Sequence, residues 1–117
     1  MKREQRLRSA ADFSRVRERA PRAWTHPLLV LYAAPNDLPQ TRLGITVSRR
    51  VGKAVVRNRV RRRVREAARL LLPQLAPGCD LVFVARPASA GADWSALKMA
   101  VEQTLARASV LRCRAEP

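Results

Sequence analysis

The chain is poor in the residues that build disulfide, zinc and membrane-spanning structures. Its two cysteines, Cys79 and Cys113, lie 34 residues apart with no Cys-x-x-Cys pair, which fits a reducing cytosol and neither a disulfide framework nor a zinc site. The longest apolar run, 28–34, holds seven residues, whereas a bilayer span needs about 20. No apolar stretch with a cleavage site follows the charged start, so we expect no signal peptide. We therefore expect a cytoplasmic protein without a membrane partner.

Acidic residues and histidine are also too few and too scattered for a catalytic centre. Hydrolysis of a phosphodiester by two metal ions needs clustered carboxylates to hold Mg²⁺, and no two of the nine acids lie within three residues of each other. The single histidine, His26, leaves no Ser-His-Asp or Cys-His set. A self-sufficient nuclease is therefore disfavoured, and we expect no catalytic residue and no metal site on this chain.

What the sequence has in excess is positive charge. Lys and Arg total 24 against nine Asp and Glu, which gives a net charge of +15. A compact body this basic repels itself, and a polyanionic partner relieves that repulsion. Hydrophobic residues make up 47% of the chain, so the charge sits on a foldable chain and not on a disordered tail. The length of 117 residues suits one domain, and we expect residues 1–117 to form a single nucleic-acid-binding domain.

Hydrophobic periodicity and turn signals predict three helices and three strands in one sheet. Ser9 and Asp12 have capping-box spacing ahead of the first helix, and Asp93 is placed to cap the last. The almost wholly apolar strand at 79–85 is expected at the centre of the sheet. This order corresponds to an α/β (α+β) two-layer sandwich. The expected elements are helix 10–19, strand 24–34, turn 35–40, strand 42–48, helix 53–72, strand 79–85 and helix 94–108.

The helix expected at 53–72 carries a row of like charges. Nine of the seventeen residues from Arg49 to Arg65 are Lys or Arg, and none is acidic. Valines collect on one stripe that suits packing on a sheet, while Arg57, Arg61 and Arg65 form a row at i, i+4 spacing. Such like-charge neighbours destabilise a helix by about 0.2–0.5 kcal/mol per pair. Because guanidinium groups bind phosphates and base edges bidentately, we interpret the row as a nucleic-acid-binding surface and not as a solvated face.

The basic helix alone does not separate DNA from RNA, and here a resemblance adds information. The stretch GKAVVRNRVRRRVRE, residues 52–66, resembles the RNR motif of the bacterial ribonuclease P protein subunit. The preceding RLGITVSRR, residues 42–50, resembles the strand that leads into that motif. The resemblance covers about residues 6–110 in order, with further matches at Arg6-Leu7-Arg8, Asp12-Phe13, Val30-Leu31-Tyr32 and the strand from Asp80 to Pro87.

The resemblance implies a protein that pairs with a large catalytic RNA and helps it to cut the 5′ leader from precursor tRNA. The active site and its Mg²⁺ ions are then expected on the RNA, with no cofactor on this chain. The resemblance also implies a mixed sheet in which a left-handed crossover, against the general right-handed rule, carries the arginine-rich helix. Residues 1–8 and 111–117 are expected to be flexible tails.

Carried over by position, the resemblance implies two sets of RNA contacts. The leader set combines aromatic and basic residues, which suits a single strand held by base stacking and a basic track. Relatives commonly carry a second aromatic residue one turn after the first, whereas this chain has Arg17 four residues after Phe13, so we expect weaker stacking and stronger phosphate contact there. The set for the partner RNA is Arg57, Asn58, Arg59, Arg61, Arg62 and Arg65, and the leader set is Phe13, Tyr32, Ser48, Arg49, Lys53 and Arg86.

Alternative interpretations stay open at this point. Phe13 and Tyr32 each fit a packed position as well as a leader contact. A general RNA-binding or ribosomal-type scaffold would share the basic helix and would lack a leader cleft. A DNA-binding helix-turn-helix is disfavoured because strands occupy the place of the helix that would precede the basic one, so no DNA partner is expected.

Overall fold

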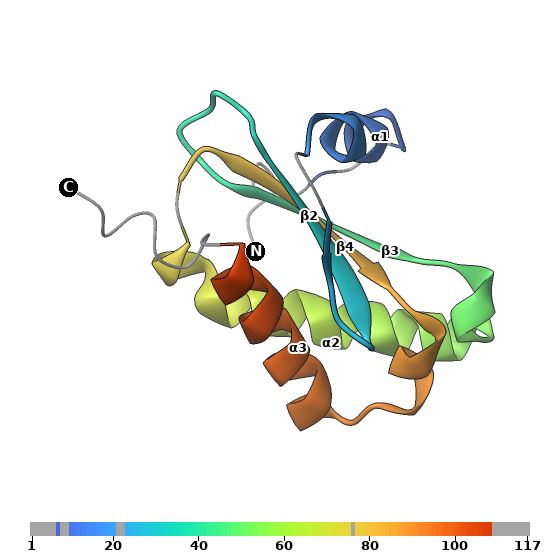
Figure 1. The fold of residues 1–117 in the computed structure, drawn as a ribbon. Helices are drawn as coiled ribbons and strands as arrows, with labels where there is room; N and C mark the ends of the chain where they lie inside the picture. Colours follow the sequence, from blue (N-terminus) through green and yellow to red (C-terminus); the bar gives the residue numbers. More distant parts are fainter. Residues whose placement is uncertain (1–6, 8–9, 21–22, 76, 109–117) are drawn as a thin grey trace.

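A computed structural model describes residues 7, 10–20, 23–75 and 77–108, and in them one four-stranded sheet carries helices on both of its faces (Figure 1). The strands are β1 (Ala23–Thr25), β2 (Leu29–Pro35), β3 (Arg42–Val47) and β4 (Cys79–Ala85). Their order across the sheet is β1-β2-β4-β3. β2 runs antiparallel to β1 and β4, whereas β3 runs parallel to β4. The expected mixed sheet is confirmed, and the apolar strand at 79–85 lies at its centre as predicted.

The prediction of a single strand over 24–34 is wrong. This segment forms a hairpin of β1 and β2, and the backbone N–H of His26 donates to Leu29 O at 2.9 Å in its turn. The imidazole Nδ1 of His26 also accepts the N–H of Leu28 at 3.0 Å. Pro27 has no N–H to donate to a neighbouring strand, so it lies in the turn. The apolar run that the sequence suggests as one strand is divided at this residue.

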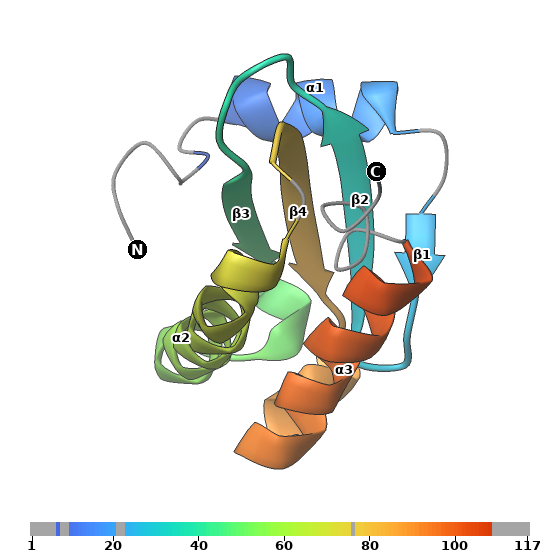
Figure 2. The ribbon, with the colours of Figure 1, turned by 90° about the vertical axis from the view of Figure 1, so that its left-hand side faces the viewer.

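The three helices match the expected ones to within two residues at each end, except that the cap at Ser9 lies outside the described residues. They are α1 (Ala10–Arg19), α2 (Ala54–Leu71) and α3 (Trp94–Arg107), with short 3-10 turns η2 (Arg49–Val51), η3 (Leu72–Gln74) and η4 (Pro87–Gly91). Asp93 caps α3 as predicted, because its Oδ1 accepts the N–H of Ala96 at 2.8 Å. α2 and α3 lie together under one face of the sheet, and α1 crosses one end of the other face (Figures 1 and 2).

The main core fills the space between the sheet and the pair α2 and α3. Alternation along the strands sends one set of side chains to this face, including Leu81 and Phe83, which are fully buried. The valine stripe of α2 packs on them through Val60 and Val64, and α3 contributes the fully buried Leu97, Val101 and Leu105. The faces of α2 that do not pack on the sheet therefore point outward. The left-handedness of the crossover from β3 through α2 to β4 stays a prediction.

A smaller cluster packs α1 on the opposite face. Val16 and Val82 are buried there, and Phe13 packs beside them. Gly44 makes this approach possible, because a Cβ on that residue would lie 2.4 Å from a ring carbon of Phe13. Leu7, in the segment expected to be a flexible tail, is buried and donates its N–H to Leu43 O at 2.7 Å. The rest of 1–8, and all of 111–117, lie outside the described residues.

A charged network fixes the end of the sheet away from η2. The guanidinium of Arg42 holds Asp80 through two bonds, Nε to Oδ1 at 2.8 Å and Nη2 to Oδ2 at 2.7 Å. Asn36 donates to the same Oδ1 at 2.8 Å. The hydrogen bond to Asp80 raises the pKa of Arg42, against the opposing effect of burial. The carboxylate of Asp80 on β4 thus joins the residue that follows β2 and the residue that begins β3.

Candidate nucleic-acid interface

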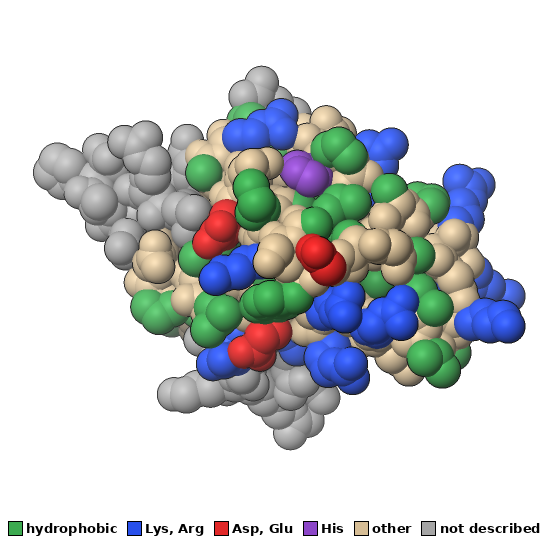
Figure 3. Space-filling model, turned by 90° about the horizontal axis from the view of Figure 1, so that it is seen from below, with side chains coloured by type: hydrophobic (Ala, Val, Ile, Leu, Met, Phe, Trp, Pro, Cys, Tyr) green, Lys and Arg blue, Asp and Glu red, His purple; other side chains and the backbone are tan. Residues whose placement is uncertain are grey.

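α2 offers cationic side chains on the flanks and the outer side of its buried stripe. On one flank lie Arg57, Arg61 and Arg65, all half-buried, and the outer side carries the exposed Asn58 and Arg62. Seen from the side of α2 and α3, Lys and Arg side chains gather toward the end of the molecule that holds η2 and the start of α2 (Figure 3). The structure therefore brings the expected set for the partner RNA onto one helix with its charged groups at the surface.

Local contacts orient several of these side chains without neutralising them. Arg57 donates from Nε to Gly52 O at 3.1 Å, and Arg61 donates from Nη1 to Asn58 Oδ1 at 2.8 Å. The backbone of Gly52 has φ 152°, a conformation that residues other than glycine rarely adopt. Each of these bonds uses one donor of a guanidinium group that has several, so the side chains keep donors for a phosphate.

The charge of this surface is not compensated by nearby carboxylates. Within the described ranges, the ion pairs join Arg15 to Asp12, Arg42 to Asp80 and Arg69 to Glu66, and none involves the arginines of the RNA set. Glu66 is the acid that interrupts the basic run, and its hydrogen bond with Arg69 lowers the pKa of the carboxyl. The helix consequently presents positive charge from its start to Arg65.

The two aromatic residues of the leader set lie on the other face of the sheet. Tyr32, Val82 and Gly44 are partners across three strands, and Phe13 packs on Gly44 from α1. Both aromatic side chains are half-buried, so each combines the packing role and the accessible role that the sequence left open. The guanidinium of Arg17 lies over the Tyr32 ring, 5.6 Å from its centroid, which is within the range of a cation–π contact.

The basic members of the leader set gather at one edge of the sheet. β3 and β4 are parallel, with Val47 opposite Ala85, so the residues that follow the two strands emerge at the same edge. Ser48, Arg49, Lys53 and Arg86 are all exposed there.

Between this edge and the aromatic row lies one row of half-buried side chains. Val30, Val84 and Thr46 are paired across β2, β4 and β3. Arg86 stands four residues along β4 from Val82, which at about 3.3 Å per residue separates the aromatic row from the basic edge by about 13 Å. The leader set is therefore divided into an aromatic part on the α1 face and a basic part at this edge of the sheet.

Two neighbours of these sets were not expected from the sequence. Arg63 flanks the valine stripe in the helical pattern, yet its Nη1 reaches Ala92 O at 3.0 Å. Trp94 packs partly against the main core and also lines a cavity of about 300 Å³ together with Arg62, Arg63 and Glu66. The i, i+4 spacing of Arg59 and Arg63 indicates that they share one side of the helix. It does not indicate that the segment leading into α3 packs beside them.

Comparison with known proteins agrees with this geometry. The family model described as Ribonuclease P matches residues 1–109. The ribonuclease P protein component of Herpetosiphon aurantiacus is 46% identical over 100% of this chain and 94% of its own length. That of Roseiflexus castenholzii is 51% identical over 96% of this chain and 92% of its own length.

Solved structures of such proteins have the same fold. The RNase P protein of Staphylococcus aureus superposes with a TM-score of 0.85 at 27% identity, over 92% of this chain and 98% of that one. The RNase P protein of Thermotoga maritima gives a TM-score of 0.78 at 28% identity, over 87% of this chain and 96% of that one. The cationic helix on its parallel crossover, the order of the strands and the match along nearly the whole sequence show that this chain belongs to the family of bacterial ribonuclease P protein components.

Proposed function

We propose that this chain binds the catalytic RNA of ribonuclease P through α2 and holds the 5′ leader of precursor tRNA on the face of the sheet that carries α1. Membership of the family implies a ribonuclease holoenzyme with an RNA partner. The observation that carries the assignment of surfaces is the uncompensated charge of α2, together with its separation from the aromatic row by the thickness of the sheet.

The assignment of α2 to the catalytic RNA rests on number and geometry of charge. Arg57, Arg61 and Arg65 stand one helical turn apart, about 6 Å from one to the next, and can each meet a phosphate. Arg59 and Arg62 with Asn58 extend the contact around the helix. A folded RNA presents many phosphates at such spacings, and the release of their counterions drives association.

The assignment of the opposite face to the leader rests on its mixture of side chains. An unpaired base can stack on the exposed part of Tyr32 or Phe13, while Ser48, Arg49, Lys53 and Arg86 bind the backbone about 13 Å further along the strands. Arg17 covers part of the Tyr32 ring, so this chain offers a guanidinium plane where relatives offer a second aromatic ring. RNA bases stack on guanidinium planes as well as on aromatic rings.

The chemistry of cleavage is assigned to the RNA partner. In the described part of the chain no group of three or more His, Cys, Asp or Glu side chains is placed to hold a metal ion. The assignment of the Mg²⁺ sites to the RNA rests on the resemblance to the family. The protein then contributes by binding and orienting the precursor and by screening the repulsion between two polyanions. No helix of the described residues is long and apolar enough to cross a membrane.

The test is reconstitution with the cognate catalytic RNA and a precursor tRNA at low Mg²⁺ concentration. We expect cleavage only when protein and RNA are both present, and loss of that cleavage when Arg57, Arg61 and Arg65 are all replaced by Ala. Each lost phosphate contact reduces the slope of log K against log salt by about 0.7–0.9, so the triple variant loses about 2–3 units of slope.

The control removes positive charge elsewhere. Replacing Arg19 with Ala, at an exposed position outside α2, is expected to change the slope much less. Cleavage by the protein alone would establish a nuclease on this chain. Binding of the RNA without any gain in cleavage would establish the general RNA-binding scaffold instead.

A further inference from the structure

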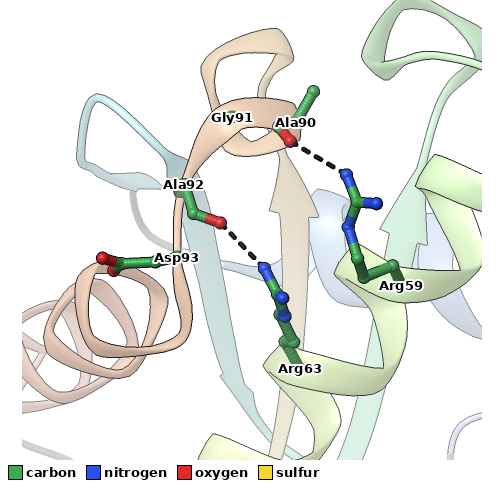
Figure 4. Close-up of a pocket in the computed structure, with 6 residues that line it drawn as sticks. All are labelled: Arg59, Arg63, Ala90, Gly91, Ala92 and Asp93. Carbon is green, nitrogen blue, oxygen red and sulfur yellow. Dashed lines mark hydrogen bonds between the residues drawn. The ribbon is translucent and has the colours of Figure 1, made fainter.

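A groove separates α2 from the segment that leads into α3. Arg59 and Arg63 stand one turn apart on α2 and reach across to this segment, where Arg59 Nη2 donates to Ala90 O at 3.3 Å and Arg63 Nη1 donates to Ala92 O at 3.0 Å (Figure 4). Together with Gly91 and Asp93 they line a cavity of about 390 Å³. The two bonds hold both guanidinium groups at the same opening.

A second cavity adjoins the first. Its volume is about 300 Å³, and Arg62, Arg63, Glu66 and Trp94 line it. Because Arg63 lines both cavities, they are neighbours. We call the two together the α2–α3 groove and define it by Arg59, Arg62, Arg63 and Trp94. The indole of Trp94 is half-buried, so part of it is available to a ligand in the groove.

The carboxylates near the groove do not cancel its charge. Asp93 uses Oδ1 to cap α3 through the N–H of Ala96, and its side chain points away from both guanidinium groups in Figure 4. Glu66 is paired with Arg69. Arg59 and Arg63 each place one bond on a carbonyl oxygen, which leaves further donors of each fork for an anion.

We propose that the α2–α3 groove takes one unpaired nucleotide of the catalytic RNA, with a phosphate between Arg59 and Arg63 and the adjoining base against Trp94. Paired guanidinium forks suit a phosphate, and the accessible part of an indole suits a base of any identity. The volume of each cavity lies near the lower end of small-ligand sites, which fits one nucleotide and not a duplex.

The groove selects the catalytic RNA and not the leader because of its place in the fold. It lies on the face that carries α2 and α3, with the sheet between it and Phe13 and Tyr32. The aromatic part of the leader set is therefore separated from the groove by the sheet. The inference rests on the proposed function, in which α2 faces the RNA, and extends the contact from the outer side of the helix to the flank beside α3.

The first experiment follows the fluorescence of each tryptophan separately. Trp24 and Trp94 are the two in the chain, so Trp24→Phe leaves Trp94 as the sole emitter and Trp94→Phe leaves Trp24. Both proteins are titrated with the cognate catalytic RNA. We expect quenching of Trp94 on association and little change at Trp24, which lies on the edge strand β1.

The second experiment measures affinity and its salt dependence. Arg63→Gln removes the charge but keeps a donor for Ala92 O, and we expect the log–log salt slope to fall by about 0.7–0.9. Trp94→Leu is expected to weaken binding about 5- to 150-fold, the range of one stacked base, while Trp94→Phe keeps most of the affinity. Arg19→Gln, an exposed residue on α1, is the charge-matched control, and thermal melting of each variant confirms that it is folded.

The outcomes separate the two proposals. Quenching confined to Trp94 together with a reduced slope for Arg63→Gln supports the groove. If the wild-type protein binds the RNA and the α2 row variant weakens it, yet Trp94 emission or the Arg63→Gln slope is unchanged, the groove is empty and the proposed function stands. Equal quenching of both tryptophans overturns the groove as well. Failure of the wild-type protein to bind the RNA overturns both.

Discussion

Replacing Arg42 with Met tests how the sheet end is held together. The variant keeps most of the apolar stem but removes both hydrogen bonds to Asp80, whose side chain is 9% exposed while that of Arg42 is 24% exposed. Breaking a fully buried ion pair from one side costs about 3–5 kcal/mol because a charge is left without its partner. Here Asn36 still donates to Asp80 and water reaches part of the pair, so we expect a loss of about 2–3 kcal/mol.

The assay is thermal unfolding followed by circular dichroism. For a domain of this size, 1 kcal/mol corresponds to about 4 °C in Tm, so Arg42→Met should lower Tm by about 8–12 °C. The double variant Arg42→Met/Asp80→Asn removes both charges, and its loss should be smaller than that of Arg42→Met alone, because no uncompensated carboxylate remains. Arg69→Gln, in the exposed pair with Glu66, is the control and should change Tm little. A single variant that melts within about 2 °C of the wild type, or a double variant that loses the sum of the two single changes, would refute this account.

The remaining predictions concern the face of the sheet that carries α1, and the cap of α3. Gly44→Ala should displace Phe13, because its new Cβ would meet the ring at 2.4 Å, and we expect weaker binding of leader-bearing precursor with little change for mature tRNA in the same titration. Tyr32→Ala should likewise raise the dissociation constant for precursor by about 5- to 150-fold, the range of one stacked base, and an equal loss for mature tRNA would point to misfolding instead. Asp93→Ala removes the cap on the N–H of Ala96 and should cost about 1 kcal/mol in a denaturant titration, with the slope of that titration unchanged.

Where the sequence carried a strong local signal, the expected structure was confirmed. Val56, Val60 and Val64 repeat at helical spacing in α2, and Val60 and Val64 are buried against the sheet while Val56 is partly buried. The strand at 79–85 is apolar on both faces because helices cover both sides of it, and its limits were predicted without error. Asp93 was recognisable as a cap because it stands immediately before an amphipathic run.

The sequence was less informative where contacts join distant segments. The hairpin of β1 and β2 depends on a turn whose hydrogen bonds involve the imidazole and backbone of His26, and periodicity does not report either. The position of Arg63 over Ala92, 29 residues away along the chain, depends on how α3 packs beside α2. The cation–π contact of Arg17 with Tyr32 depends on the angle at which α1 crosses the sheet. Such pairings follow from tertiary packing, which local patterns do not encode.

The central strand β4 limits how the two faces of the sheet can change. Val82 faces α1 and the aromatic row, while its neighbours Leu81 and Phe83 face α2. A slip of one residue in the pairing of β4 would turn each of its side chains to the opposite face of the sheet. A change of register that suited an RNA on one face would therefore also alter the side chains presented on the other face. If the α1 face binds leaders as proposed, adaptation to different leaders is confined to exchange of side chains on a fixed backbone, such as the guanidinium of Arg17 beside the Tyr32 ring.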